Sequence, residues 1–207
     1  KQGGIYFTPL EDVKVIVKEV LQHNPNIKTV LEPSCGSCEF IRYLDNNSTN
    51  ALKMVGYETD QTIFEEIKQL KFKNDVKLYN KDFLKSKKSM YDLIIGNPPY
   101  YEIIYEEPNV YFNTSKINIY LLFIIECLEQ LNKNGILAFV LPNSFLNNRY
   151  SNEFRKHITN KYKLLWVHTF ETNKYINTSQ DTCVVVIQNA KPTDNNSTFS
   201  KLIYDTL

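Results

Sequence analysis

Apolar runs and amphipathic stretches alternate along almost the whole chain, and this alternation restricts the possible folds more than any other feature of the sequence. The apolar runs predict strands at 28–32, 52–58, 76–80, 91–95, 135–142, 163–170 and 181–188. Helical periodicity predicts helices at about 9–23, 37–46, 60–70, 116–132 and 148–160. Strands that alternate with helices of this length favour a mainly parallel seven-stranded sheet in an α/β fold, with helices on both faces. A polar loop joins the last two strands, so we expect those two to pair antiparallel.

The chain has 207 residues, of which 43% are hydrophobic, and this suffices for one large α/β domain. We expect residues 1–190 to form that domain. Residues 191–207 are polar and then weakly apolar, so we expect a tail or the start of a following domain there. The chain begins at Lys1 rather than Met, which is consistent with a piece trimmed from something longer.

The cysteines indicate a reducing compartment, and the hydropathy of the chain bears on membrane spans and signal segments. No apolar run approaches the ~20 residues of a membrane-spanning helix, and no signal-like segment opens the chain. The four cysteines, Cys35, Cys38, Cys127 and Cys183, are too few and too scattered for a disulfide framework. We therefore expect the cytoplasm, or a nucleoid or viral replication compartment, rather than secretion. The net charge of +1 does not exclude an anionic partner, because a nucleic-acid enzyme can concentrate its positive charge locally.

The segment "YDLIIGNPPY" (91–100) ends a buried strand with two prolines. Proline has no ladder N–H and a fixed φ, so the strand cannot continue through Pro98 and Pro99. Asn97 and Tyr100 therefore flank two rigid backbone units at the carboxyl end of a strand. In parallel sheets, ligands bind at that edge.

The segment "TVLEPSCGSCEF" (29–40) is a strand, a short loop and a helix start. Glu32 closes the strand, and the loop from Ser34 to Ser37 offers backbone N–H groups near a helix N-terminus, where a cofactor's polar groups can bind. The dinucleotide-binding pattern G-x-G-x-x-G is absent, which disfavours a dinucleotide site. A plain strand–helix connection is the alternative.

The next two strands also end in acids. Glu58 lies about 20 residues beyond the loop, a spacing that suits a carboxylate bonded to ribose hydroxyls, although an N-cap region with Asp60 is the alternative. Asp82 and Phe83 follow the third strand, where an acid can bind an adenine amino group while the ring covers the base. The alternative there is a solvated acid beside a core phenylalanine. Acids at three successive strand ends are more telling than any one of them.

Taken together, these segments resemble the gamma-type N6-adenine DNA methyltransferases of restriction-modification systems, which use S-adenosylmethionine. "NPPY" matches their catalytic motif, "LEPSCGSCEF" their cofactor loop, "GGIYFTP" the segment before that loop, and "GILAFVLPNSFL" a later strand and loop. The matches cover nearly the whole chain in the expected order, with Cys38 in place of a usual glycine. "NPPY" alone is shared with enzymes that methylate glutamine in release factors and with some ribosomal-RNA methyltransferases. The upstream "TP" with "EPSCG" favours DNA.

The resemblance implies a Rossmann-like class I methyltransferase fold and a site that needs no metal. The residues expected to contact S-adenosylmethionine are Thr8, Pro9, Glu32, Ser34, Cys35, Gly36, Glu58, Asp82, Phe83 and Asn97. Catalysis would use the Asn97 side-chain oxygen and the Pro98 carbonyl as acceptors for the two N6–H groups, with Pro99 fixing the turn. Tyr100 would stack on an adenine flipped out of duplex DNA, and Tyr175 or Phe170 would face the base from the other side. Either of the last two rings could instead belong to the core.

Other interpretations stay open. Cys35-x-x-Cys38 after a strand is the context of a redox pair or of half a zinc site, but neither explains the rest of the chain. Eight lysines between 68 and 88 are a solvated surface or a phosphate-contacting patch. Enzymes of this type that select a DNA sequence carry a recognition domain or work with a specificity subunit. The alternatives are an enzyme acting on RNA adenine or protein glutamine, and a catalytically silent subunit that binds DNA or a partner.

Overall fold

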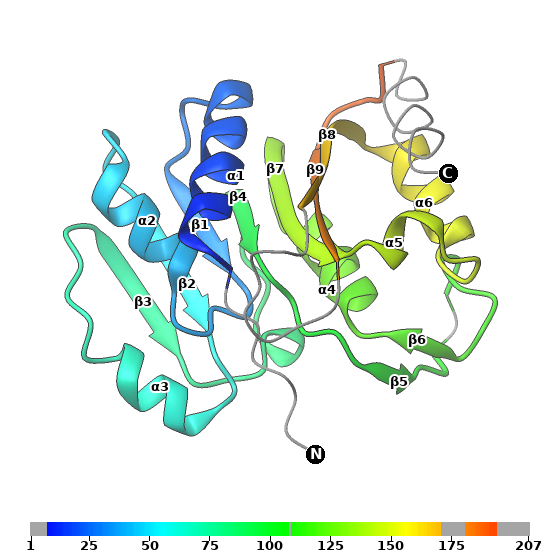
Figure 1. Cartoon of the computed structure of the whole chain (residues 1–207), viewed down its shortest axis with the longest axis horizontal. Helices are drawn as coiled ribbons and strands as arrows, with labels where there is room; N and C mark the ends of the chain where they lie inside the picture. Colours follow the sequence, from blue (N-terminus) through cyan, green and yellow to red (C-terminus); the bar gives the residue numbers. More distant parts are fainter. Residues whose placement is uncertain (1–7, 108, 171–180, 194–207) are drawn as a thin grey trace.

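The computed structural model describes residues 8–107, 109–170 and 181–193. Seven strands form one sheet in the order β3-β2-β1-β4-β7-β9-β8 (Figure 1). They are β1 (Thr29–Glu32), β2 (Lys53–Tyr57), β3 (Asp75–Tyr79), β4 (Tyr91–Gly96), β7 (Leu131–Pro142), β8 (Lys163–Phe170) and β9 (Thr182–Gln188). The pairs among β1, β2, β3, β4 and β7 are parallel, whereas β9 pairs antiparallel with both β7 and β8. The expected mainly parallel sheet and its antiparallel last pair are confirmed.

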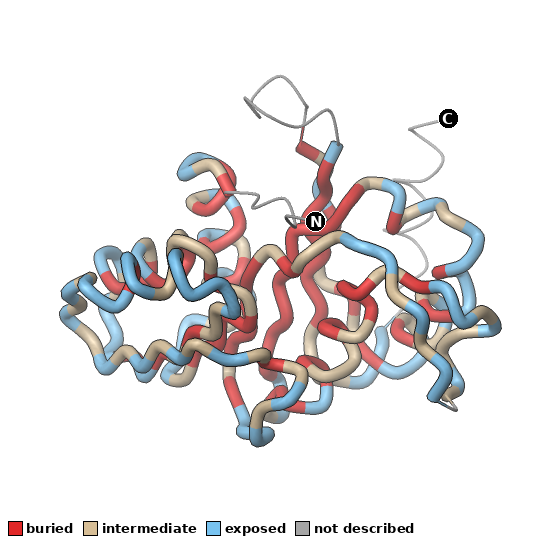
Figure 2. Tube along the Cα trace, turned by 90° about the horizontal axis from the view of Figure 1, so that it is seen from below, coloured by how far each residue is buried: buried red, intermediate tan, exposed pale blue. Residues whose placement is uncertain are grey.

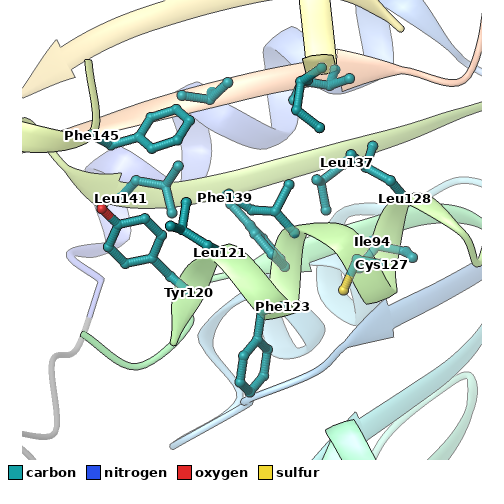
Figure 3. Close-up of a cluster of buried hydrophobic side chains, with 14 of the residues drawn as sticks. Ile94, Tyr120, Leu121, Phe123, Cys127, Leu128, Leu137, Phe139, Leu141 and Phe145 are labelled. Atoms are coloured by element: carbon teal, nitrogen blue, oxygen red, sulfur yellow. The ribbon is translucent and has the colours of Figure 1, made fainter. Parts of the chain in front are cut away.

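Two hydrophobic clusters cover the two faces of this sheet, because successive strand residues point to opposite sides. Val30 and Leu93 belong to the cluster under α1 (Leu10–His23), α2 (Glu39–Asn47) and α3 (Gln61–Ile67). Leu31 and Ile94 belong to the cluster under α4 (Tyr120–Leu128), α5 (Ser144–Asn147) and α6 (Asn152–Lys161). Figure 2 shows the central strands as the most continuously buried part of the trace, and Figure 3 shows α4 packed on β7.

The region after the "NPPY" segment differs from the sequence prediction. The helix expected at 116–132 is limited to Tyr120–Leu128, because β6 (Lys116–Asn118) pairs with β5 (Glu102–Ile104) in a small antiparallel hairpin. At its other end β7 begins at Leu131, opposite Tyr91, and the register then shifts before Leu93 pairs with Ile136. The sequence missed this hairpin because three-residue strands carry too little periodicity to stand out.

The helix expected at 148–160 corresponds to α6 (Asn152–Lys161), and the turn α5 before it was not expected. The single turn of α5 precedes a loop, and α6 begins only at Asn152. Arg155 holds the loop in place, since its Nη1 donates to the Phe145 and Asn148 carbonyl oxygens at 2.6 and 3.0 Å. None of the helices in the described ranges is long and apolar enough to cross a membrane.

Candidate active site

The carboxyl ends of β1, β2, β4 and β7 open at one edge of the sheet, because these strands run parallel. The loop after β1 is held against the end of β2: the Cys35 N–H donates to the Tyr57 carbonyl at 2.8 Å. The Gly36 N–H donates to the Glu58 carboxylate at 3.0 Å. Gly36 has φ +50°, and a Cβ built there would meet no atom within 4 Å. A ligand can therefore approach the backbone at Gly36 closely.

Cys38 stands where the resemblance expects glycine, and its backbone shows why glycine is usual there. It has φ 63° and ψ 39°, in the left-handed region, and its side chain is fully buried. A residue with a Cβ is strained in this conformation by about 1–2 kcal/mol relative to glycine. Cysteine in place of glycine at position 38 thus costs a small amount of stability and does not indicate a different loop shape.

The Cys35–Cys38 pair is enclosed in the core. Both thiols are free and buried, and the Cys38 N–H donates to the Cys35 carbonyl at 2.6 Å. A hydrogen bond with Cys38, together with burial, raises the pKa of the Cys35 thiol. A buried thiol with a raised pKa is a poor nucleophile, which argues against the redox interpretation. Among the described residues, no group of three or more His, Cys, Asp and Glu side chains could hold a metal ion.

Glu32 lies beneath the loop, with only 2% of its surface exposed. Its Oε2 accepts a hydrogen bond from the Ile41 N–H at 3.1 Å, at the start of α2. Burial raises the pKa of this carboxyl well above its usual range. A Cβ added at Gly96 would lie 3.6 Å from the Glu32 Cγ, so the end of β4 passes close to this acid.

Glu58 connects the first two strand ends. Besides its contact with Gly36, its Oε1 accepts from the Asp60 N–H at 2.7 Å, and its backbone carbonyl accepts from the Asn80 side chain at 2.9 Å. The N-cap of α3 is Asp60, whose side chain accepts from the N–H groups of Thr62 and Ile63. The N-cap residue itself is Asp60, and Glu58 contacts it within the same cap region, so the role of Glu58 in ribose binding stays a prediction.

Asp82 and Phe83 follow β3 as expected, but Phe83 is a core residue. Asp82 caps the short helical turn Phe83–Lys85 by accepting from the Leu84 N–H at 3.0 Å. Phe83 is 3% exposed, and its ring lies 5.7 Å from both Tyr57 and Phe123. This placement fits the alternative of an acid beside a core phenylalanine, while Asp82 stays close to the strand end.

Tyr57 and Tyr79 are the aromatic residues at this edge that sequence reasoning missed. They end β2 and β3, and their rings stack with centroids 5.4 Å apart. Tyr79 is 37% exposed, so it offers a ring surface that Phe83 does not. The signal that could have identified these two tyrosines is that each is the last residue of its strand, and the two strands pair with each other.

The "NPPY" segment joins the β1 loop to the N-terminal segment. The Ser34 hydroxyl donates to the Asn97 carbonyl at 3.1 Å. The Asn97 side-chain Nδ2 lies 3.5 Å from the Oγ1 of Thr8, which is buried. Pro9, next to Thr8, occupies the N-cap position of α1, and its carbonyl accepts from the Val13 N–H. The structure thus brings Thr8, Ser34 and Asn97 together from three separate segments.

Tyr100 is held between the end of β4 and β7. Its hydroxyl is within hydrogen-bonding distance of the Asn97 Oδ1 and lies 2.8 Å from the Val140 carbonyl. Its ring meets that of Tyr120 edge-on, with centroids 6.1 Å apart, and Tyr120 meets Phe145 in the same way at 6.0 Å. Tyr120 and Phe145 belong to the cluster drawn in Figure 3. Sequence reasoning gave neither residue a place near the site.

The second base-facing aromatic stays a prediction. Phe170 is 9% exposed, lies edge-on to His168 and packs in the cluster under α1, α2 and α3. This burial fits the core role that was the alternative for Phe170. Tyr175, the first choice for the position, lies outside the described residues.

The lysine-rich stretch does not form one continuous patch of unpaired charge. Lys68 pairs with Glu65, and Lys85 lies 3.6 Å from Asp82. Lys88 lies within 2.9 Å of two glutamates near the end of α4. These four ion pairs favour a solvated surface over a dedicated phosphate site for the three lysines involved.

The sequence of this chain matches the model of a known protein family. The family described as Eco57I restriction-modification methylase matches residues 28–176. Modification methylase CviBIII of Paramecium bursaria Chlorella virus NC1A is 30% identical over 199 residues, which are 92% of this chain and 51% of that protein. Type II methyltransferase M.AccI of Acinetobacter calcoaceticus is 29% identical over 209 residues, covering 94% of this chain and 38% of that protein. The chain spans about half the length of these curated relatives, or less.

Solved structures show the same fold at low sequence identity. A protein from Listeria monocytogenes that is assigned to the class I S-adenosylmethionine-dependent methyltransferases superposes with a TM-score of 0.74 and 14% identity, covering 98% of this chain and 72% of that one. A type I restriction-modification methyltransferase subunit from Streptococcus thermophilus gives 0.72 and 16%, covering 99% and 53%. The expected Rossmann-like class I methyltransferase fold is confirmed.

Proposed function

The chain belongs to the Eco57I restriction-modification methylase family, and on this premise we propose that it transfers a methyl group from S-adenosylmethionine to the N6 amine of adenine in DNA. Residues 1–190 would form the catalytic domain, and residues 191–207 a tail or the start of a recognition domain. The observation that carries the proposal is the position of Asn97. Its side chain and carbonyl touch Thr8 and Ser34, from the segments expected to bind the cofactor, and also the ring expected to stack on the base, Tyr100.

The residues at the strand ends fit S-adenosylmethionine. The open space at Gly36 allows close approach to the backbone, and the Glu58 carboxylate stands beside it. Asp82 and the exposed ring of Tyr79 lie at the ends of the next strand. We propose that Glu58 binds the ribose hydroxyls and that Asp82 binds the adenine amine, with Thr8, Pro9, Glu32, Ser34, Cys35 and Asn97 completing the site. When bound, the cofactor supplies an electrophilic methyl group on its sulfonium.

The chain's own residues orient the acceptor. An aromatic amine is a weak nucleophile because its lone pair is delocalised into the ring. The Asn97 Oδ1 and the Pro98 carbonyl would accept its two N–H groups and so favour a nitrogen whose lone pair is free to react. Pro98 and Pro99 hold that carbonyl rigidly, because their φ angles are fixed. Stacking on Tyr100, worth about 1–3 kcal/mol, would offset part of the cost of taking the base out of the duplex.

DNA is the proposed macromolecular partner. The relatives named above are a modification methylase and a type II methyltransferase, and a structural neighbour is described as a type I restriction-modification methyltransferase subunit. We propose that sequence selection rests on a recognition domain or a specificity subunit, since in this proposal the site would contact only the flipped base.

Transfer of labelled methyl from S-adenosylmethionine tests the proposal. Unmethylated DNA of diverse sequence, RNA and a release factor serve as parallel acceptors for the full chain and for Asn97→Ala. We expect label on DNA alone, reduced about 10²–10³-fold in Asn97→Ala, the typical loss when one preorganised polar group is removed. Label on RNA or on the release factor instead of DNA would identify that molecule as the substrate. No label on any acceptor, despite cofactor binding, would identify a silent subunit.

A further inference from the structure

Unpaired buried polar atoms are concentrated in the connection between β7 and α6. Among the described residues, the buried side-chain nitrogen and oxygen atoms that form no hydrogen bond are the Asn143 Oδ1, the Asn148 Nδ2 and the Ser151 Oγ. All of them lie in this connection. Burying a polar atom without a partner is unfavourable, so such atoms are rare in native proteins. Their concentration in one connection indicates a binding role for it.

This connection lies at the edge of the sheet that carries the "NPPY" segment. β7 and β8 both pair antiparallel with β9, so they run parallel to each other. The chain leaves the carboxyl end of β7 through α5 and returns along α6, so the N-terminus of α6 opens at that edge (Figure 1). The hydroxyl of Tyr150, just before α6, lies 3.3 Å from the hydroxyl of Tyr120. The ring of Tyr120 contacts Tyr100, which links this N-terminus to the ring proposed to stack on the base.

The N-terminus of α6 has no side-chain cap. Ser151 occupies the N-cap position, where a serine hydroxyl normally accepts from the second or third helical N–H group. Here its side chain makes no such bond, although the residue is 0% exposed. None of the described residues supplies an acceptor to the N–H of Glu153 or Phe154, and the Glu153 carboxylate instead lies 2.9 Å from the Lys156 Nζ. Free N–H groups at a helix N-terminus favour an anion.

The contacts of Asn148 decide which end of its amide is unpaired. Its Oδ1 accepts from the Ser151 N–H at 2.9 Å, and a backbone N–H can only donate. The Nδ2 is therefore the other end of the amide and remains a donor without an acceptor. The Asn143 Oδ1, by contrast, is an acceptor and has no part in binding an anion.

Arg155 adds a positive charge that has no acidic partner among the described residues. Its Nη1 donates to the backbone carbonyls of Phe145 and Asn148, which are neutral. Burial lowers the pKa of Arg155, while Tyr120 and Tyr150 act in the opposite direction, which places the guanidinium near both hydroxyls. A half-buried cation beside unpaired donors is a setting that an anion would stabilise.

We propose that the N-terminus of α6, with Asn148, Ser151 and Arg155, binds a phosphate of the DNA backbone next to the target base. Amide, hydroxyl and guanidinium donors together with helix N–H groups are the groups that contact DNA phosphates. This inference rests on the proposed function, because it takes DNA as the partner. A phosphate contact carries no sequence information, so it does not replace the proposed recognition domain or specificity subunit.

Access to the buried donors involves Tyr150. Its side chain is 36% exposed, and its 3.3 Å contact with Tyr120 is longer than an ordinary O–H···O hydrogen bond. The proposal therefore includes an outward turn of the Tyr150 side chain, after which the phosphate oxygens reach the Asn148 Nδ2 and the Ser151 hydroxyl.

Asn148→Asp tests the site with little change of shape. One aspartate oxygen still accepts from the Ser151 N–H, while the other puts a negative charge in place of the Nδ2 donor. We expect the affinity for a fluorescein-labelled duplex, measured by anisotropy, to fall about tenfold. The slope of log affinity against log salt should become shallower by about 0.9, the loss of one phosphate contact.

Asn147→Asp is the matched control for Asn148→Asp. Asn147 is the exposed last residue of α5, so the same negative charge is added next to the site but outside it. We expect less than about a twofold change in affinity at physiological salt, where exposed charges are screened.

Ser151→Ala separates a ligand-binding serine from a structural one. Removing a capping serine lowers the stability of its helix. The Ser151 hydroxyl has no partner, so its removal should leave the urea midpoint of unfolding unchanged or higher. We expect the affinity for the duplex to fall about fivefold in the same variant, as for loss of one hydrogen bond.

Neutral backbone analogues locate the phosphate. Duplexes that carry one methylphosphonate, at successive positions around the methylated base, are bound to the wild-type chain and to Asn148→Asp. One position beside the base should weaken binding by the wild-type chain and leave binding by Asn148→Asp unaffected, because that variant has already lost the contact.

Several results would overturn the inference: wild-type affinity in Asn148→Asp, an equal loss in Asn147→Asp, or a Ser151→Ala chain that is less stable yet binds DNA normally. A wild-type chain that binds no duplex would overturn it as well. If the wild-type chain binds DNA but methylates no base, the proposed function fails, while the affinities of the three variants still decide whether the phosphate site exists.

Discussion

The two halves of the active-site edge are held together by different interactions. In the half proposed to bind the cofactor (the cofactor half), formed by the ends of β1, β2 and β3, acidic side chains accept hydrogen bonds from backbone N–H groups: Glu32 from Ile41, Glu58 from Gly36, and Asp82 from Leu84. In the acceptor half, formed by the ends of β4 and β7, prolines end the strand and a series of aromatic rings supports it. Substitutions that remove a charge should therefore have their main effect in the cofactor half. Substitutions that remove side-chain volume should have their main effect in the acceptor half.

Among the substitutions that test this contrast, Tyr120→Ala is expected to have the largest effect, on the free energy of unfolding. Tyr120 is among the largest fully buried side chains, and its ring contacts both Tyr100 and Phe145. Removing a buried aromatic ring costs about 3–5 kcal/mol of unfolding free energy, because a cavity remains. Urea unfolding measures this loss. Tyr101→Ala, at a side chain that is 49% exposed, is the control and should lose less than about 1 kcal/mol. Equal losses in both variants would contradict a ring-supported acceptor half.

The next largest effect is expected from Glu58→Gln, which removes a charge and keeps the shape. An amide oxygen can still accept from the Gly36 N–H, so the β1 loop should keep its conformation, while the second acceptor, which binds the Asp60 N–H, is lost. A charged acceptor exceeds a neutral one by about 1–2 kcal/mol, so affinity for S-adenosylmethionine should fall about tenfold. Calorimetric titration measures it, with the exposed Glu66→Gln on α3 as control. Unaltered affinity in Glu58→Gln would remove Glu58 from the cofactor site.

A smaller effect is expected from Glu32→Gln, in the pH dependence of stability. Burial raises the pKa of Glu32 in the folded state, so the folded protein holds this proton more tightly than the unfolded chain does. The stability from this group is complete below the unfolded pKa of about 4.3 and is lost as pH rises through the raised value. Glu32→Gln should therefore gain unfolding free energy relative to wild type as the pH rises above the unfolded pKa of this group. Parallel pH profiles for the two proteins would show that Glu32 has no such raised pKa.

The smallest effect concerns the strained Cys38. In an ordinary helix interior, alanine is more stabilising than glycine by about 1 kcal/mol. At φ 63° the order should be reversed, so that Cys38→Gly unfolds at a higher urea concentration than Cys38→Ala. The opposite order would mean that the left-handed conformation at this residue carries no cost.

The sequence was sufficient for features that depend on local patterns. The strands, their mainly parallel order and the polar residues at each strand end follow from periodicity, and proline chemistry explains why β4 stops at Gly96. The β5–β6 hairpin and the shortened α4 could not be found, since three-residue strands carry too few alternating positions. The support of Tyr100 by Tyr120 and Val140 also escaped prediction, because ring packing between residues far apart in sequence leaves no local pattern.

The most direct test of the central claim is to identify the methylated base. DNA treated with the full chain and S-adenosylmethionine is digested to nucleosides and analysed by mass spectrometry. We predict N6-methyladenine as the methylated product, as in the gamma-type N6-adenine enzymes that the sequence resembles, with the Asn97 Oδ1 and the Pro98 carbonyl as the proposed acceptors for its amine. A methyl group on cytosine C5 would contradict this account of the acceptor half, and one on cytosine N4 would contradict adenine as the target base.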